Sequence, residues 1–150
     1  MVYEGVLDKL GWKNYEMNQW HIIDIPEKSL KSIVKEIEMK MKAKTIRVVG
    51  NPKVMISKVG LVLGAAGSGA HYAMLQHKDC QLLIVGETNE WETVPYIQDA
   101  ITQGQPRALI VLGHADSEEA GMIYCRDWLK KYYPLMKIEF IQAGNPYWRN

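Results

Sequence analysis

Cysteine is scarce in this chain. Of 150 residues only Cys80 and Cys125 are cysteines, and neither belongs to a CxxC pair or a Cys/His cluster. This pattern excludes a disulfide-stapled secreted mini-protein and a zinc finger. Isolated thiols are typical of proteins kept in a reducing compartment, so the sequence predicts a cytoplasmic protein.

An excess of charge of one sign is also missing, because 18 Lys+Arg stand against 17 Asp+Glu, a net charge of +1. This balance argues against a nucleic-acid binder held by a basic face. No apolar stretch approaches the roughly 20 residues of a membrane helix. The chain does not open with a charged segment and an apolar block, the pattern of a secretory signal. We therefore expect neither nucleic acid nor membrane among its partners.

Apolar residues, in contrast, are plentiful. They make up 47% of the chain, enough for a real core, and 150 residues suit one domain. Residues 1–20 are the least informative part, and we interpret them as a linker or extension with a short helix ended by Gly11. The sequence predicts a single domain over residues 1–150.

From residue 21 onward, short apolar segments alternate with helical ones. Ser29 is the expected N-cap of a helix through Met41, since apolar residues recur there at spacings of three and four. Strands are predicted at 21–25 (ended by Pro26), 45–49, 58–63, 81–85, 107–112 and 136–141, further helices at 71–77, 92–102 and 117–133, and a turn and tail at 144–148. Ser117 is the expected cap of the last helix. Met122 and Trp128 are expected on the buried side of that helix.

This alternation indicates an α/β fold. Apolar strands joined by helices form βαβ crossovers, so we expect a three-layer α/β domain with a largely parallel mixed sheet. Its central strands are expected at 45–49, 58–63, 81–85 and 107–112. In such a sheet, ligands bind beyond the carboxyl ends of the strands. Three glycine-containing segments occupy such ends, at 64–69, 86–87 and 113–118.

The first of these segments is a glycine loop that contains Gly67, Ser68 and Gly69. It matches neither the Walker pattern nor Gly-x-Gly-x-x-Gly. Its backbone N–H groups could cradle an anion at the start of a helix, which makes these three residues candidate substrate or anion ligands. A tight strand-to-helix turn without a ligand is the alternative. Ser68 has no identifiable base, so a serine hydrolase is not indicated.

The third segment contains His114 and Glu118, spaced as His-x-x-x-Glu across a strand end and the first helical turn. Imidazole and carboxylate at the mouth of a sheet suit a divalent metal ion. The alternative is that His114 is an ordinary loop residue and that Glu118 only complements the helix dipole. Two side chains are too few for a complete site. Asp116 and Glu119 lie near enough in sequence to be spare ligands.

Glu87 follows the second strand end, a costly place for an acid unless it is paired or near a cation. Glu90 and Glu92 make the loop after it acidic. Three roles remain open for Glu87: it supports a metal, binds substrate or caps the following helix.

Five sequence motifs, taken in their order along the chain, resemble those of a known family. They are VVGNP (48–52), KVGLVLGAAGSG (58–69), GE (86–87), GHADSE (113–118) and NPY (145–147). Together they are similar to the C-terminal half of the Nif-three-like dinuclear-metal-centre family. The resemblance implies two related α/β halves, a two-metal site between them and closed homo-oligomers. It also implies that His114 and Glu118 are metal ligands.

Two departures from the family pattern qualify what the resemblance implies. The family's other ligands, a His-His pair and an Asp, belong to an N-terminal half, and no adjacent histidines occur here. The family commonly has a histidine four residues after the Glu of the Gly-Glu loop, where this chain has Trp91. The chain therefore resembles a fragment, a truncated product or a variant without part of the site.

The family resemblance implies a metal-dependent hydrolase, with a cyclohydrolase-type label, that acts on a small molecule through zinc, manganese, iron or magnesium. Without the other half, the expectation for this chain alone is a homo-oligomer with a weak metal site and negligible activity. The alternative is a non-enzymatic binding or assembly module that has lost a complete metal site.

Overall fold

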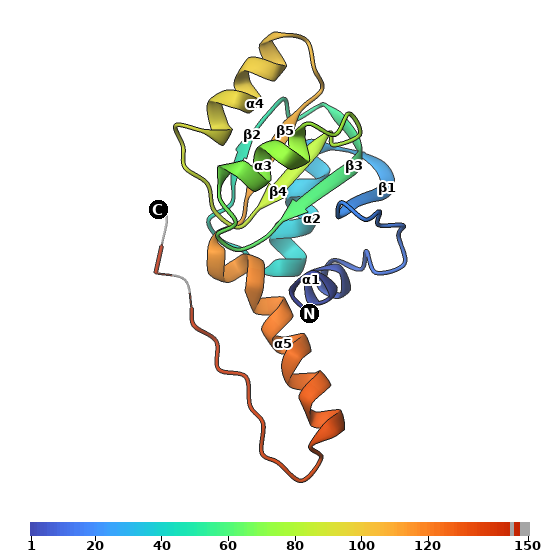
Figure 1. Ribbon diagram of the computed structural model, residues 1–150, viewed down its shortest axis with the longest axis vertical. Coiled ribbons are helices and arrows are strands. Elements are labelled where there is room, and N and C mark those ends of the chain that lie inside the picture. Colours follow the sequence, from blue (N-terminus) through green and yellow to red (C-terminus); the bar gives the residue numbers. More distant parts are fainter. Residues whose placement is uncertain (145, 148–150) are drawn as a thin grey trace.

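The computed structural model describes residues 1–144, 146 and 147 (Figure 1). Asn145, in the last motif, and Trp148, in the predicted tail, lie outside the described residues. The elements in chain order are α1 (Val2–Leu10), β1 (Ile22–Ser29), α2 (Leu30–Met41), β2 (Arg47–Val49), β3 (Met55–Val62), α3 (Ser68–Leu75), β4 (Leu82–Val85), α4 (Thr93–Thr102), β5 (Ala108–Val111) and α5 (His114–Tyr132).

The five strands form one mixed sheet in the order β1-β3-β4-β5-β2. The three inner strands β3, β4 and β5 run parallel, whereas β1 and β2 pair antiparallel with their neighbours at the two edges. Every residue of β4 and β5 is buried, as expected for strands covered on both faces. The predicted α/β class with a largely parallel mixed sheet is confirmed.

Helices cover both faces of the sheet and complete three layers (Figure 1). On one face, α1 and α2 bury Val6, Leu10, Ile33 and Ile37 against alternate strand residues such as Ile84. On the other face, α3 and α4 pack in a second cluster that includes Leu75, Ile97, Leu83 and Val85. The alternation of Leu83 and Ile84 between the clusters follows from the two-residue period of a strand.

Residues 1–20 belong to the body of the domain. Trp12 is buried, as are the core-facing residues of α1. Gly5 allows α1 to approach α5 closely, because a Cβ there would stand 2.6 Å from the Ala120 carbonyl carbon. The short helix that the sequence predicts here, ended by Gly11, is α1, and it packs on α5 as part of the domain.

The edge strands differ from the prediction in two respects. β1 continues through Pro26 to Ser29, with a register irregularity between Asp24 and Lys28. Proline is tolerated there because β1 lies at the sheet edge and its irregularity interrupts the ladder. The segment predicted at 45–49 is not central either, since β2 is a three-residue edge strand that is mostly exposed.

The C-terminal region also differs from the prediction. Residues 136–141 form no strand, because no edge of the sheet pairs with them in the described part of the chain. Met122 and Trp128 are exposed, whereas Ala120 and Gly121 are buried where α5 meets α1. The end of α5 projects beyond the sheet, and the tail returns toward the start of the helix, where Gln142 contacts Glu119 (Figure 1).

Among the described residues, no helix is both long and apolar enough to span a bilayer.

Candidate functional site

The candidate site is built on the carboxyl ends of the three parallel strands. Backbone hydrogen bonds continue the sheet into the loops: Gly86 donates to Val62, Glu87 to Gly64 and Gly113 to Gly86, at 3.2, 3.2 and 2.8 Å. The loops at 64, 86–87 and 113 are therefore held together as one layer. Because the strands run the same way, residues far apart in sequence meet at one edge, as predicted.

Helix α5 begins at His114 rather than at the predicted Ser117 cap. Gly113 is the N-cap residue and has φ 98°, a left-handed conformation that glycine adopts without strain. Ser117 is buried in the first turn, where its hydroxyl donates to the His114 carbonyl at 2.7 Å and accepts from the Gly64 N–H at 3.0 Å. Ser117 thus ties the first glycine loop to the start of α5.

His114 lies between two carboxylates. Its Nδ1 is 3.3 Å from Glu87 Oε1, and its Nε2 is 3.3 Å from Glu118 Oε2, one helical turn further on. All three side chains are partly exposed. Gly64 leaves room for this arrangement, since a Cβ there would overlap Glu118 Oε1. The sequence placed these three side chains at one sheet edge, and the structure brings them together.

This arrangement is suited to a cation. A neutral imidazole carries a single N–H, so it can donate to one of the two carboxylates but not to both. The second contact then needs another proton or a positive ion. Two ligand atoms on one tetrahedral zinc, each about 2.1 Å from the ion, lie about 3.4 Å apart. The 3.3 Å between Nε2 and Glu118 matches that separation.

The two carboxylates face opposite sides of the His114 ring, so they do not converge on a single ion. Accordingly, no group of three or more His, Cys, Asp or Glu side chains is placed to hold a metal within residues 1–144, 146 and 147. Glu87 instead lies at the other ring nitrogen, where a carboxylate can accept the second N–H of a ligating histidine and hold the ring in one orientation. His114 and Glu118 would supply two of the ligands that a complete site needs. Glu87 would hold the His114 ring in place without binding the ion.

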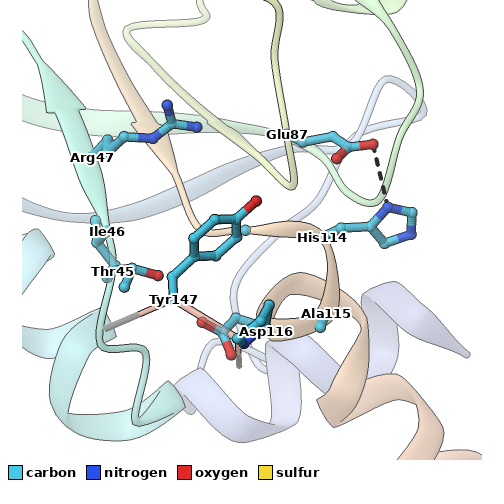
Figure 2. Close-up of a pocket in the computed structure, with 10 residues that line it drawn as sticks. Thr45, Ile46, Arg47, Glu87, His114, Ala115, Asp116 and Tyr147 are labelled. Atoms are coloured by element: carbon cyan, nitrogen blue, oxygen red, sulfur yellow. Dashed lines mark hydrogen bonds and ion pairs between the residues drawn. The ribbon is translucent and has the colours of Figure 1, made fainter. Parts of the chain in front are cut away.

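A cavity of about 610 Å³ opens beside His114 (Figure 2). Figure 2 shows the Arg47 side chain and the Tyr147 hydroxyl directed toward the space next to Glu87. The lining residues are Thr45, Ile46, Arg47, Glu87, Gly113, His114, Ala115, Asp116, Pro146 and Tyr147. Sequence reasoning missed Arg47 and Tyr147 because neither follows a parallel strand. An antiparallel edge strand and the returning tail bring them to the site.

The glycine loop lies outside the residues that line this cavity. Helix α3 begins at Ser68, three residues before the predicted start, with Gly67 as its N-cap. A Cβ at Gly67 or Gly69 would meet nothing within 4 Å. Gly67 has φ 80°, which a tight strand-to-helix turn explains. Close contacts at the site instead require glycine at Gly64, which lies against Glu118, and at Gly86, which lies against Gly64 and Ser117.

The acidic loop between β4 and α4 borders the cavity through two side chains. Glu87 lines it directly, and Glu90 forms an ion pair with Arg47. Glu92 accepts a hydrogen bond from the Asn89 side chain at 2.6 Å. Trp91, where the family commonly has a histidine, points into solvent with 77% of its surface exposed. It therefore takes no part in the site as the structure stands.

His71 is buried away from the cavity, in α3. Its Nδ1 lies 2.8 Å from Thr93 Oγ1 on α4, and among the described residues its Nε2 has no hydrogen-bond partner. Burial lowers the pKa of His71 below its ordinary value, and the Glu92 carboxylate opposes this effect. The neutral ring therefore joins α3 to α4 at neutral pH.

We expect His71 to make folding acid-sensitive. Its pKa is lower in the folded than in the unfolded chain, so its contribution is present above about pH 6.5 and is lost as the pH falls toward the folded pKa. One such proton adds a slope of at most about 1.4 kcal/mol per pH unit. Urea unfolding at pH 7 and pH 5 measures this loss, which should be smaller in His71→Asn. His77→Gln, in the turn that follows this helix, should behave as wild type, and an unchanged loss in His71→Asn would contradict the assignment.

Comparisons with solved structures show the fold. Protein ybgI, described as of unknown function, aligns with TM-score 0.76 and 16% identity over 97% of this chain and 57% of its own. A Staphylococcus aureus hypothetical protein, SA1388, aligns with TM-score 0.66 and 18% identity over 86% and 42%, respectively. A Bacillus cereus protein related to NIF3 aligns with TM-score 0.67 and 15% identity over 86% and 35%.

The chain thus spans well under two thirds of the length of these solved proteins. No curated protein matches it. The profile of the family Duf34/NIF3 (NGG1p interacting factor 3) matches residues 4–146, nearly the whole chain. The chain therefore belongs to the Duf34/NIF3 family.

Proposed function

We propose that this chain is the metal-binding half of a dinuclear-metal, hydrolase-like protein. The observation that carries the proposal is the position of His114, with a carboxylate 3.3 Å from each ring nitrogen. His114 Nε2 and Glu118 are the proposed ligands of a divalent ion. Glu87 is the proposed partner of Nδ1–H, and it borders the space in which a substrate would lie.

A divalent ion held here would polarise a substrate and lower the pKa of its bound water toward about 7. The donor set of one imidazole and one carboxylate is shared by zinc, manganese and iron, and the carboxylate also suits magnesium. Glu87 would orient the imidazole, and the cavity beside it would shelter a small molecule from bulk water. A structural or catalytic site needs at least three protein ligands, so further ligands must come from another half or another copy. On this proposal the chain alone has negligible hydrolase activity.

Zinc titration of the metal-free chain by calorimetry tests the proposal. We expect saturable binding of one ion per chain in the micromolar range. His77→Ala is the matched control, because His77 follows the C-terminal end of α3, contacts the Trp20 ring and does not line the cavity, so zinc affinity should stay unchanged. Absence of saturable binding would contradict the metal-binding proposal and leave the assembly function as the remaining candidate.

A second candidate function is assembly, which one observation favours. Large apolar side chains lie exposed on the projecting half of α5 and on the tail, namely Trp128, Tyr132, Tyr133, Leu135, Met136 and Ile141. A concentration of large exposed apolar side chains in one segment is typical of interaction sites. We propose a homo-oligomer formed through this surface, in which another copy of the chain covers α5 and the tail.

The assembly proposal predicts the behaviour of a charged substitution. Leu135→Lys places a charge where an apolar contact is expected, so it should shift the protein from oligomer to monomer in light scattering. Met39→Lys is the control, because Met39 is also well exposed but lies on α2. A wild-type monomer, or an oligomer that Leu135→Lys leaves intact, would contradict this surface as the interface.

The proposed location is the cytoplasm. Cys80 and Cys125 are both free thiols, which is typical of a reducing compartment.

A further inference from the structure

We propose that the cavity beside His114 binds a small organic anion through Arg47. The carboxylate or phosphate group of the ligand lies on the Arg47 guanidinium, and a flat apolar body lies against Ile46 and Tyr147. This inference deepens the proposed function by naming the class of ligand, and it rests on that function only in assigning the ligand as substrate. Anion binding itself requires no metal.

The sheet holds Arg47 at the cavity. Arg47 pairs with Val111, the last residue of β5, and Gly113 and His114 follow two and three residues later. The antiparallel edge strand β2 thus places the cationic side chain of Arg47 next to the carboxyl end of β5. Figure 2 shows the guanidinium reaching over the cavity toward Glu87 and the Tyr147 hydroxyl.

The guanidinium of Arg47 keeps most of its donors available. Within the described part of the chain, Nη1 of Arg47 forms an ion pair with Glu90. Both side chains of this pair are exposed. A guanidinium has five N–H donors in a fork that matches a carboxylate or phosphate. An exposed ion pair is weak, so a ligand anion can replace Glu90 or bind beside it. Arg47 is the single Lys or Arg among the described lining residues.

The remaining lining defines the rest of the ligand. A volume of about 610 Å³ lies within the range typical of small-molecule sites. Ile46 and the Tyr147 ring supply apolar and aromatic surface for a flat body. Glu87 repels a second negative charge, so the anionic group belongs on the guanidinium of Arg47. The opposite end of the ligand then reaches the side of His114.

Binding of three probes to the metal-free chain tests the inference, with phenyl phosphate, benzoate and inorganic phosphate titrated separately by calorimetry or NMR. We expect saturable binding of phenyl phosphate, benzoate or both, which separates a phosphate from a carboxylate preference. Arg47→Gln should weaken that binding about tenfold or more, since it removes charge-assisted hydrogen bonds. Arg126→Gln is the matched control, because Arg126 pairs with Asp127 on α5 outside the cavity.

Two further variants sharpen the result. Arg47→Lys keeps the charge but loses the fork, so its affinity should fall between those of wild type and Arg47→Gln, and it replaces Arg47→Gln if that variant does not fold. Tyr147→Ala should weaken phenyl phosphate more than inorganic phosphate. Zinc affinity should stay unchanged in Arg47→Gln, which separates this inference from the metal proposal. Failure of the wild type to bind any probe, or equal binding by Arg47→Gln, would overturn it.

Discussion

Replacing Gly86 by alanine should lower the free energy of unfolding by about 3 kcal/mol or more, among the largest effects of a single methyl group. A Cβ at Gly86 would overlap the Gly64 carbonyl oxygen and stand 2.5 Å from the Gly64 nitrogen and 2.7 Å from Ser117 Oγ. These neighbours cannot move cheaply, because Gly64 also accepts the Glu87 N–H. Urea unfolding or a melting curve measures the loss.

Gly69→Ala is the control for the Gly86 substitution. Gly69 has no positive φ, lies in the first turn of α3, and a Cβ there would meet nothing within 4 Å. Its replacement should leave stability unchanged or raise it by up to about 1 kcal/mol, since alanine loses less backbone entropy on folding. Equal stability of the two variants would contradict the close packing of the loops behind the site.

Loss of zinc affinity should follow the order His114→Ala, then Glu118→Gln, then Glu87→Gln. His114→Ala removes one of two proposed ligands and should weaken binding about 100-fold or more, whereas loss of a supporting carboxylate such as Glu87 typically costs about 10–100-fold. Calorimetric titration of each variant measures these affinities. Their melting temperatures should stay near that of wild type, because all three side chains are partly exposed.

Glu119→Gln is the matched control for this series. Glu119 is next to Glu118 in sequence, but its side chain accepts a hydrogen bond from Gln142 in the tail at 3.1 Å. Its replacement should leave zinc affinity unchanged. If Glu119→Gln weakened zinc binding as much as Glu118→Gln, general acidic attraction would explain binding better than a specific pair.

The core of the candidate site could be predicted from the sequence because it depends on regular geometry. Apolar runs with flanking glycines identify β3, β4 and β5, and parallel strands bring their following residues to one edge. A spacing of four residues at a helix start places His114 and Glu118 one turn apart. Glu87 follows from the same rule, applied to the neighbouring strand.

Other parts of the structure depend on contacts that residue patterns do not encode. Nothing in residues 45–49 reveals the antiparallel direction of β2, which places Arg47 at the cavity. The start of α5 before Ser117 depends on the positive φ of Gly113, whereas serine before a helical segment looks like a cap. The alternation at 136–141 predicts a strand, but a strand must pair with a neighbour, and in the described chain these residues pair with neither edge of the sheet.

The most direct test of the metal proposal is the tautomer and zinc response of His114, measured by long-range proton–nitrogen NMR at neutral pH. We predict that the proton stays on Nδ1, facing Glu87, and that added zinc shifts the Nε2 resonance toward the metal-bound range. In Glu87→Gln this preference for one tautomer should weaken. Zinc bound through Nδ1, or a His114 spectrum that zinc leaves unchanged while the protein stays folded, would contradict His114 Nε2 as a metal ligand.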